Sequence, residues 1–251
     1  MATVSTVRRR GGFSAEQLLG LSGLALLAAL PLQVVGFLLH PPSEQLRHVL
    51  QPTYGPAHVV LFGSWALAML GLPGLYARQA GRAGVPGLVG FALTMVAGCY
   101  HCYLALYEGF AVPVMARQPA TQALLGPGGQ LAHGAGALGA VASLSLLGFP
   151  LLGVATVRAR VFPRGVGWLQ ILCVPVFFAL MIVQAMVFGE GNAGPNATSW
   201  VAGMLSVAML YWLLFAGYAW AGARLCWPRV APVATEPTAA EPTARPTPAP
   251  R

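Results

Sequence analysis

The chain has 251 residues, of which 57% are hydrophobic and only 8% are charged, whereas charged residues make up about a quarter of an ordinary soluble domain. This composition excludes a soluble globular protein and indicates a membrane protein. The net charge of +8 comes from fourteen arginines, with no lysine and no aspartate. Because these arginines lie in short clusters at the ends of apolar stretches, they indicate membrane topology and not nucleic-acid binding.

The apolar stretches are continuous and do not alternate between apolar and polar residues. This pattern favours an all-α, polytopic integral membrane protein over a barrel. Each stretch is about 20 residues or longer and can cross a hydrocarbon core about 30 Å thick. Six transmembrane helices are predicted, over Leu18–Leu39, Ala57–Tyr76, Gly84–Tyr107, Leu131–Val157, Val166–Phe188 and Trp200–Cys226.

The predicted domain division follows from these helices. Residues 1–15 form a cytoplasmic N-terminal segment, and residues 16–227 form the six-helix membrane domain. Residues 228–251 are rich in Pro, Ala and Thr and are predicted to be a disordered cytoplasmic tail. The arginines at positions 8–10 resemble the start of a signal peptide, but the apolar stretch after them is too long for one, so we expect a retained first helix.

The arginines also predict the orientation. The N-terminal segment, the second and fourth loops and the C-terminal end carry two or more arginines each, while the opposite loops carry only Arg47 and Arg117. Since Lys and Arg gather on the cytoplasmic side, both termini are predicted to be cytoplasmic. We expect a multi-pass protein of the plasma membrane, from a bacterium.

The second and third spans share an order of features with the fourth and fifth, which suggests a degenerate repeat of a helical hairpin. In both, a histidine comes first, then Gly-x-Pro, an arginine turn, a proline and finally Glu-Gly. Pro86 follows Gly71 by fifteen residues, and Pro163 follows Gly148 by the same fifteen. Coincidence in a chain rich in Gly and Pro is the alternative.

The predicted topology brings all five histidines to the extracytoplasmic half, together with three glutamates: His40, His48, His58, His101, His133, Glu44, Glu108 and Glu190. His101 and Glu108 are seven residues apart and share a helix face, with about 10 Å of rise between them. Ionisable groups inside a membrane are costly and are therefore candidates for a functional site. The alternative is that His101 bonds between helices and that Glu108 lies in water.

The preferred function is binding of a metal ion or a b-type haem by His58, His133 and His101, with Glu108 nearby. Imidazole suits iron, copper and zinc, and helical bundles hold cofactors between facing helices. His58 and His133 occupy equivalent positions of the suggested repeat. They would form the natural pair.

Two other functions are compatible with the same residues. The first is a proton-coupled or small-solute transporter that also uses Gln33 and Gln184, although no ionisable residue continues into the inner half. The second is a non-catalytic assembly or scaffold subunit, for which the small residues of 133–143 allow close helix packing. The expected partners are the lipid bilayer and either a second copy or a partner membrane subunit, with no nucleic acid.

The motif Cys99-x-x-Cys102 is predicted to be packing. Its mid-helix position offers neither a helix N-terminus nor a cation to stabilise a thiolate, and one CxxC cannot form a four-sulfur zinc site. The chain contains no nucleophile elbow, Walker loop, dinucleotide fingerprint or His-Glu-x-x-His. Whether the protein is an enzyme is left undecided by the sequence.

Overall fold

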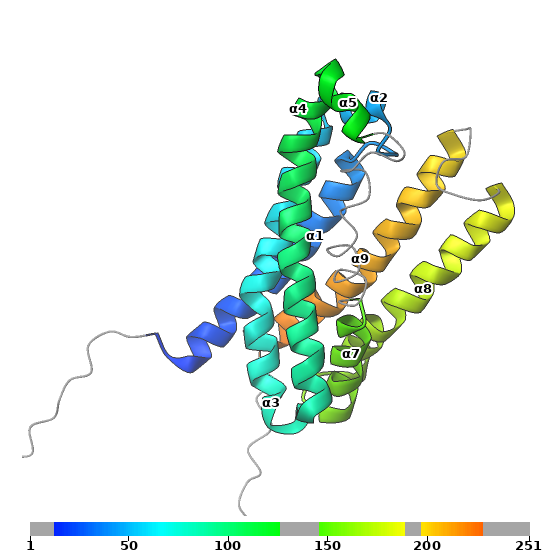
Figure 1. Cartoon of the computed structure of the whole chain (residues 1–251). Coiled ribbons are helices and arrows are strands. Elements are labelled where there is room, and N and C mark those ends of the chain that lie inside the picture. Colours follow the sequence, from blue (N-terminus) through cyan, green and yellow to red (C-terminus); the bar gives the residue numbers. More distant parts are fainter. Residues whose placement is uncertain (1–12, 126–145, 189–196, 228–251) are drawn as a thin grey trace, which may run out of the picture.

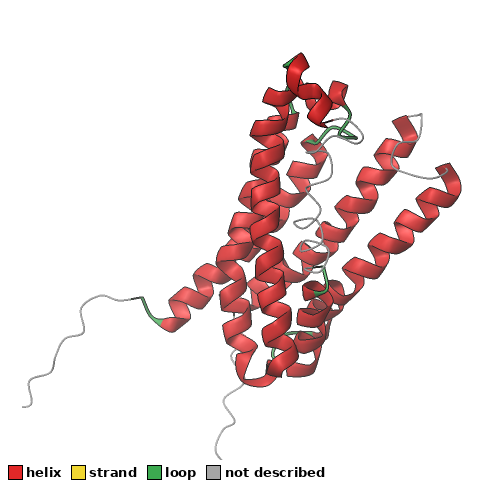
Figure 2. Ribbon diagram, viewed as in Figure 1, coloured by secondary structure: helices red, strands yellow, loops and turns green. Residues whose placement is uncertain are grey.

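The computed structural model describes residues 13–125, 146–188 and 197–227. Every element in these ranges is a helix, which confirms the predicted all-α class (Figure 2). The order along the chain is α1 (Ala15–Leu39), α2 (Leu46–Val49), α3 (Tyr54–Leu106), a π-helical turn η1 (Tyr107–Ala111), α4 (Val112–Ala116), α5 (Pro119–Leu125), α7 (Gly148–Ala159), α8 (Arg164–Phe188) and α9 (Ala197–Cys226).

Helix α1 has clear start and stop signals. At its start, the Ser14 hydroxyl accepts a hydrogen bond from the backbone N–H of Gln17 at 3.1 Å, and the Gln17 side chain accepts one from the Ser14 N–H at 2.8 Å. This reciprocal capping box satisfies backbone donors that the helix leaves open. At its end stands His40, followed by two prolines that cannot continue the helix. The local sequence therefore places His40 at the helix terminus.

Helix α3 folds back on itself at Gly84 (Figure 1). Gly84 has φ 61° and ψ −167°, a conformation that residues with a side chain rarely adopt. The two arms, residues 54–83 and 85–106, lie side by side and antiparallel, so that Tyr76 of the first stacks on Phe91 of the second with ring centroids 4.6 Å apart. These arms match the second and third predicted helices.

The long helices form a closed ring of contacts. Helix α3 packs against α1 and α7, α1 packs against α9, and α8 packs against both α7 and α9. Glycines allow the closest approaches: a Cβ added to Gly222 of α9 would lie 2.5 Å from the carbonyl oxygen of Gly23 on α1. Small residues at such crossings let helix backbones meet inside a membrane.

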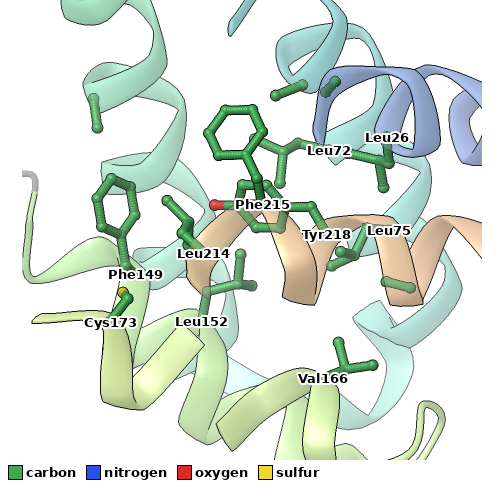
Figure 3. Close-up of a cluster of buried hydrophobic side chains, with 14 of the residues drawn as sticks. Leu26, Leu72, Leu75, Phe149, Leu152, Val166, Cys173, Leu214, Phe215 and Tyr218 are labelled. Carbon is green, nitrogen blue, oxygen red and sulfur yellow. The ribbon is translucent and has the colours of Figure 1, made fainter. Parts of the chain in front are cut away.

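The largest group of buried apolar side chains lies inside this ring and draws on all five long helices. Figure 3 shows its central members, which include Leu26, Leu72, Leu75, Phe149, Leu152, Val166, Leu214, Phe215 and Tyr218. The outward faces carry large apolar side chains instead, with Met186 81% exposed and Leu70 68% exposed. Exposed apolar surface of this extent suits contact with lipid.

Within the described ranges, four helices are long and apolar enough to cross a membrane: Ala15–Leu39, Tyr54–Ala116, Arg164–Phe188 and Val201–Cys226. The second includes both arms of α3. The predicted fourth span, Leu131–Val157, lies outside the described residues up to position 145, and the part that is described belongs to the 12-residue helix α7. The count of six spans therefore stays a prediction, and the predicted tail at 228–251 also lies outside the described residues.

The two ends of the bundle differ in composition. The thiol of Cys226 on α9 donates to the carbonyl oxygen of Gly20 on α1 at 3.4 Å, so the start of α1 and the end of α9 lie together. Gln79, near the α3 bend, bonds to Thr156 of α7 at 3.1 Å. We call the end of the bundle that holds these two contacts the arginine end, because the helix ends there carry Arg78, Arg82, Arg158, Arg160, Arg164 and Arg224. The opposite end, where α1 stops and α3 begins, is the histidine end.

Candidate metal centre at the histidine end

His40 and Glu44 form an ion pair just beyond α1. His40 Nε2 lies 3.3 Å from Glu44 Oε1, and His40 Nδ1 donates to the carbonyl oxygen of Pro41 at 2.6 Å. Burial alone would lower the pKa of His40, but the hydrogen bond and negative charge of Glu44 outweigh burial and raise this pKa above its ordinary value. Glu44 keeps 55% of its side chain exposed. Partial desolvation by its neighbours would raise the pKa of Glu44, but the hydrogen bond and charge of His40 outweigh this effect and lower the pKa.

The first two turns of α3 supply Tyr54 and His58. Tyr54 is fully buried, and its hydroxyl donates to the carboxylate of Glu44. His58 lies one turn further along, is 2% exposed, and donates from Nδ1 to the carbonyl oxygen of Tyr54 at 2.8 Å. The ring centroids of His58 and His40 are 4.8 Å apart, and both rings contact Tyr54. A tyrosine thus holds both imidazoles and one carboxylate in place.

Glu108 reaches His58 from the other arm of the α3 hairpin. His58 Nε2 lies 3.1 Å from Glu108 Oε2. Glu108 belongs to η1, and π-helical turns of this kind often occur at functional sites. The next residue, Gly109, packs directly on His58, because a Cβ added there would lie 2.8 Å from the His58 Cβ. The missing side chain at position 109 allows the arms to come close enough for this contact.

Three of these residues have the spacing of a metal site. One ligand atom from each of His40, Glu44 and His58 lies within 4.8 Å of the others, the one such group in the parts of the chain that the structure describes. Ligand atoms around a tetrahedral ion sit about 3.3 Å apart when the bonds are about 2.0 Å long. The three ligand atoms would therefore have to move closer together on binding an ion. Imidazole nitrogen with carboxylate oxygen suits divalent zinc, manganese, iron, nickel or copper.

The backbone assigns the same tautomer to both histidines. Nδ1 of His40 and Nδ1 of His58 each face a carbonyl oxygen, which can only accept, so the proton lies on Nδ1. In a neutral ring Nε2 then carries a lone pair, and both lone pairs point at carboxylate oxygens. Such an arrangement needs a proton or a cation between the partners. Histidines that bind metals commonly make this same bond from their other nitrogen.

The charge of the site also indicates that either protons or a cation lie between these partners. If both imidazoles are neutral and both carboxylates are ionised, Glu44 and Glu108 give the site a charge of −2. A charge of this size in a partly buried site is costly unless it is compensated. One divalent cation or two protons neutralise it fully.

The predicted site residues have different places in the structure. His58 and Glu108 are in contact, as described above. His101 lies apart from them: Nδ1 donates to the carbonyl oxygen of Ala97 at 2.7 Å, and Nε2 accepts from the hydroxyl of Tyr211 at 2.6 Å. Both of its nitrogens are therefore engaged. His133, the fourth predicted residue, lies outside the described residues.

Two residues of this centre were not selected from the sequence. His40 and Glu44 were placed in the outer half, but neither was predicted to be a ligand. The available signal was the short segment HPPSE, in which a proline pair ends a helix and leaves a histidine and a glutamate four residues apart. The contact between His40 and His58 arises from the packing of α1 on α3, which the sequence does not state.

Comparisons with known proteins identify no relative of this chain. The chain matches no protein-family model, and no curated protein or solved structure is significantly similar to it. Function is in any case decided by the chemistry of a site more than by the fold that carries it.

Proposed function

We propose that this protein binds a divalent transition-metal ion through the Nε2 atoms of His40 and His58 and the carboxylate of Glu44, with Glu108 beside them. The observation that carries the proposal is the pair of histidines whose Nδ1 atoms are held by backbone carbonyls and whose Nε2 atoms face carboxylates. Two imidazoles and one carboxylate form the ligand set of several metal sites that keep a fourth position open.

A bare ion fits this geometry better than a haem. The rings of His40 and His58 are in edge contact, with centroids 4.8 Å apart and planes at 62°. A porphyrin plane inserted between two axial histidines needs those rings on opposite faces of the macrocycle, and rings in direct contact leave no room for it. Haem binding at this pair would require the ends of α1 and α3 to separate.

We further propose six membrane spans with both termini in the cytoplasm, which places the metal centre on the extracytoplasmic side. The clustering of arginines at one end of the bundle supports this orientation. At that end a hollow is lined by Arg158, Arg160, Arg164, Val157 and Trp168, a composition suited to the anionic inner surface of a bacterial membrane. In the plasma membrane the centre would face the outside of the cell.

Metal titration of the detergent-purified protein, after removal of bound ions with a chelator, tests the metal-binding function. Isothermal titration with zinc, manganese and nickel is expected to give one site per chain for at least one ion. His40→Ala and His58→Ala should each weaken that site at least 100-fold, because each removes a direct ligand. His48→Asn is the matched control, since His48 lies in the same segment and bonds to Ser43 at 2.6 Å instead.

The same experiment separates the alternatives. A protein that binds no ion, or that binds one equally well in both histidine variants, would refute the metal centre and favour a scaffold role. A chain that binds haem would show a Soret band in the purified protein. A solute transporter would instead be recognised by flux into liposomes.

A further inference from the structure

Polar side chains recur at two-turn intervals along the second arm of α3 and into η1. Thr94, His101 and Glu108 are each seven residues apart, so they share one helix face with about 10 Å of rise between neighbours. Helix α9 faces them with two tyrosines at the same spacing. Tyr211 donates its hydroxyl proton to His101 Nε2 at 2.6 Å, and Tyr218 lies beside Thr94.

Further buried polar residues on α7 and α8 continue this series toward the arginine end. Gln170 of α8 packs against Gly217, the neighbour of Tyr218, because a Cβ added to Gly217 would lie 3.4 Å from the Gln170 Cγ. Gln170 also packs against Gly153 of α7. One turn beyond Gly153, Thr156 accepts a hydrogen bond from Gln79 at 3.1 Å.

We call Thr94, Tyr218, Gln170, Thr156 and Gln79, together with the His101–Tyr211 pair, the polar column. The first five of these are 0–1% exposed. The column begins two helical turns below Glu108 and ends near the bend of α3, so it follows most of the length of the bundle.

Several atoms of the polar column have no hydrogen-bond partner among the residues that the structure describes. They are Gln79 Oε1 and both amide atoms of Gln170, whereas the hydroxyls of Thr94 and Tyr218 lie close enough to each other for a weak hydrogen bond. A buried polar atom without a partner costs stability, and native proteins normally satisfy such atoms with internal water. If these groups served only to hold the helices together, they would hydrogen-bond to one another across helices. Neither the amide nitrogen nor the amide oxygen of Gln170 has such a partner.

We propose that the polar column holds a chain of internal water molecules and conducts protons between the region of His101 and the arginine end. Hydroxyl groups and water both donate and accept hydrogen bonds, which is the property that a relay needs. Each hop breaks one O–H bond and forms another at the next hydroxyl or water oxygen, so every hydroxyl and water returns to its starting protonation after one proton has passed. The glutamine amides orient these waters by hydrogen bonds and do not take up the proton. Polar groups inside membrane bundles commonly mark such relays. This inference is independent of the metal centre.

Proton flux through the full-length protein in liposomes tests the relay. The vesicles contain a pH-sensitive dye, and a potassium gradient with valinomycin supplies the driving potential. The wild-type protein is expected to carry protons at least tenfold faster than protein-free vesicles. Thr94→Val, Tyr218→Phe and Gln170→Met each remove polar atoms at nearly constant volume, and each should reduce this flux at least fivefold.

Two controls separate the relay from general damage. Ser64→Ala and Ser206→Ala remove buried hydroxyls that lie outside the column and bond to the carbonyl oxygens of Ala29 and Ala202, and both should keep wild-type flux. Flux equal to that of protein-free vesicles would overturn the proposal. A Tyr218→Phe protein that melts at a higher temperature with undiminished flux would also overturn it, because that result indicates that the polar column holds no water.

Discussion

Glu108 and Glu44 approach the two histidines from different parts of the chain and differ in what they contact. Glu44 bonds to His40 and Tyr54 within one short segment, whereas Glu108 meets His58 across 50 residues of sequence. A carboxylate that only supports a ligand typically contributes a factor of about 10–100 to metal affinity. The contribution of Glu108 can therefore be measured by a change that keeps its shape.

Glu108→Gln is expected to lower metal affinity about 10–100-fold, because it removes one negative charge beside His58. The melting temperature of the metal-free protein should stay close to the wild-type value, since the amide N–H of glutamine can donate to the lone pair on His58 Nε2. Isothermal titration and thermal unfolding check the two halves of this prediction. Unchanged affinity would show that Glu108 takes no part in binding.

The His40–Glu44 pair predicts how the stability of the metal-free protein depends on pH. His40, whose pKa is raised from 6.5, stabilises the fold fully below that pH and loses its effect as the pH rises through the folded pKa. Glu44, whose pKa is lowered from 4.5, stabilises the fold above that pH and loses its effect as the pH falls through the folded pKa.

The difference in melting temperature between the wild type and Glu44→Gln should therefore be largest between pH 4.5 and pH 6.5 and should shrink on both sides of this window. Thermal unfolding of both proteins in the presence of a chelator, in buffers of different pH, measures this difference in melting temperature. A difference that does not vary with pH would mean that the two groups do not form an ion pair in the folded protein.

At the scale of elements, the π-helical turn η1 and Gly109 determine how closely the two arms of α3 approach. Gly109→Ala places a Cβ 2.8 Å from the His58 Cβ, so the arms must separate and His58 must move from Glu108. We expect metal affinity to fall about tenfold or more. Gly81→Ala is the control on the same helix, because a Cβ added there meets nothing within 4 Å. This variant should bind metal normally and be slightly more stable, since alanine is favoured over glycine in a helix by about 1 kcal/mol.

The helices were largely predictable and the site was only partly so. Continuous apolar stretches identified α1, both arms of α3, α8 and α9, and the predicted ends at Leu39 and Cys226 coincide with the observed ones. The start of the third predicted helix at Gly84 coincides with the bend. In contrast, η1 and the contact between His40 and His58 depend on how distant segments pack, and nothing in a single sequence reports that packing.

At the scale of the whole molecule, the separation of the arginine end from the histidine end predicts the topology. Alkaline phosphatase, which is active only outside the cytoplasm, should be inactive when fused after Trp227 and active when fused after Arg117. The reason is that Trp227 follows the arginine end and Arg117 follows the histidine end. The reverse pattern would place the metal centre in the cytoplasm and would contradict the proposed orientation.

The central claim, that nitrogen and oxygen atoms of His40, His58 and Glu44 bind an ion, is tested most directly by X-ray absorption at the zinc edge of the zinc-loaded protein. The predicted spectrum has a shell of nitrogen and oxygen at about 2.0–2.2 Å with the scattering signature of two imidazole rings, and His40→Ala should remove one ring. A sulfur shell at about 2.3 Å, as Cys99 and Cys102 would produce, would contradict the claim. A spectrum unchanged in His40→Ala would contradict it equally.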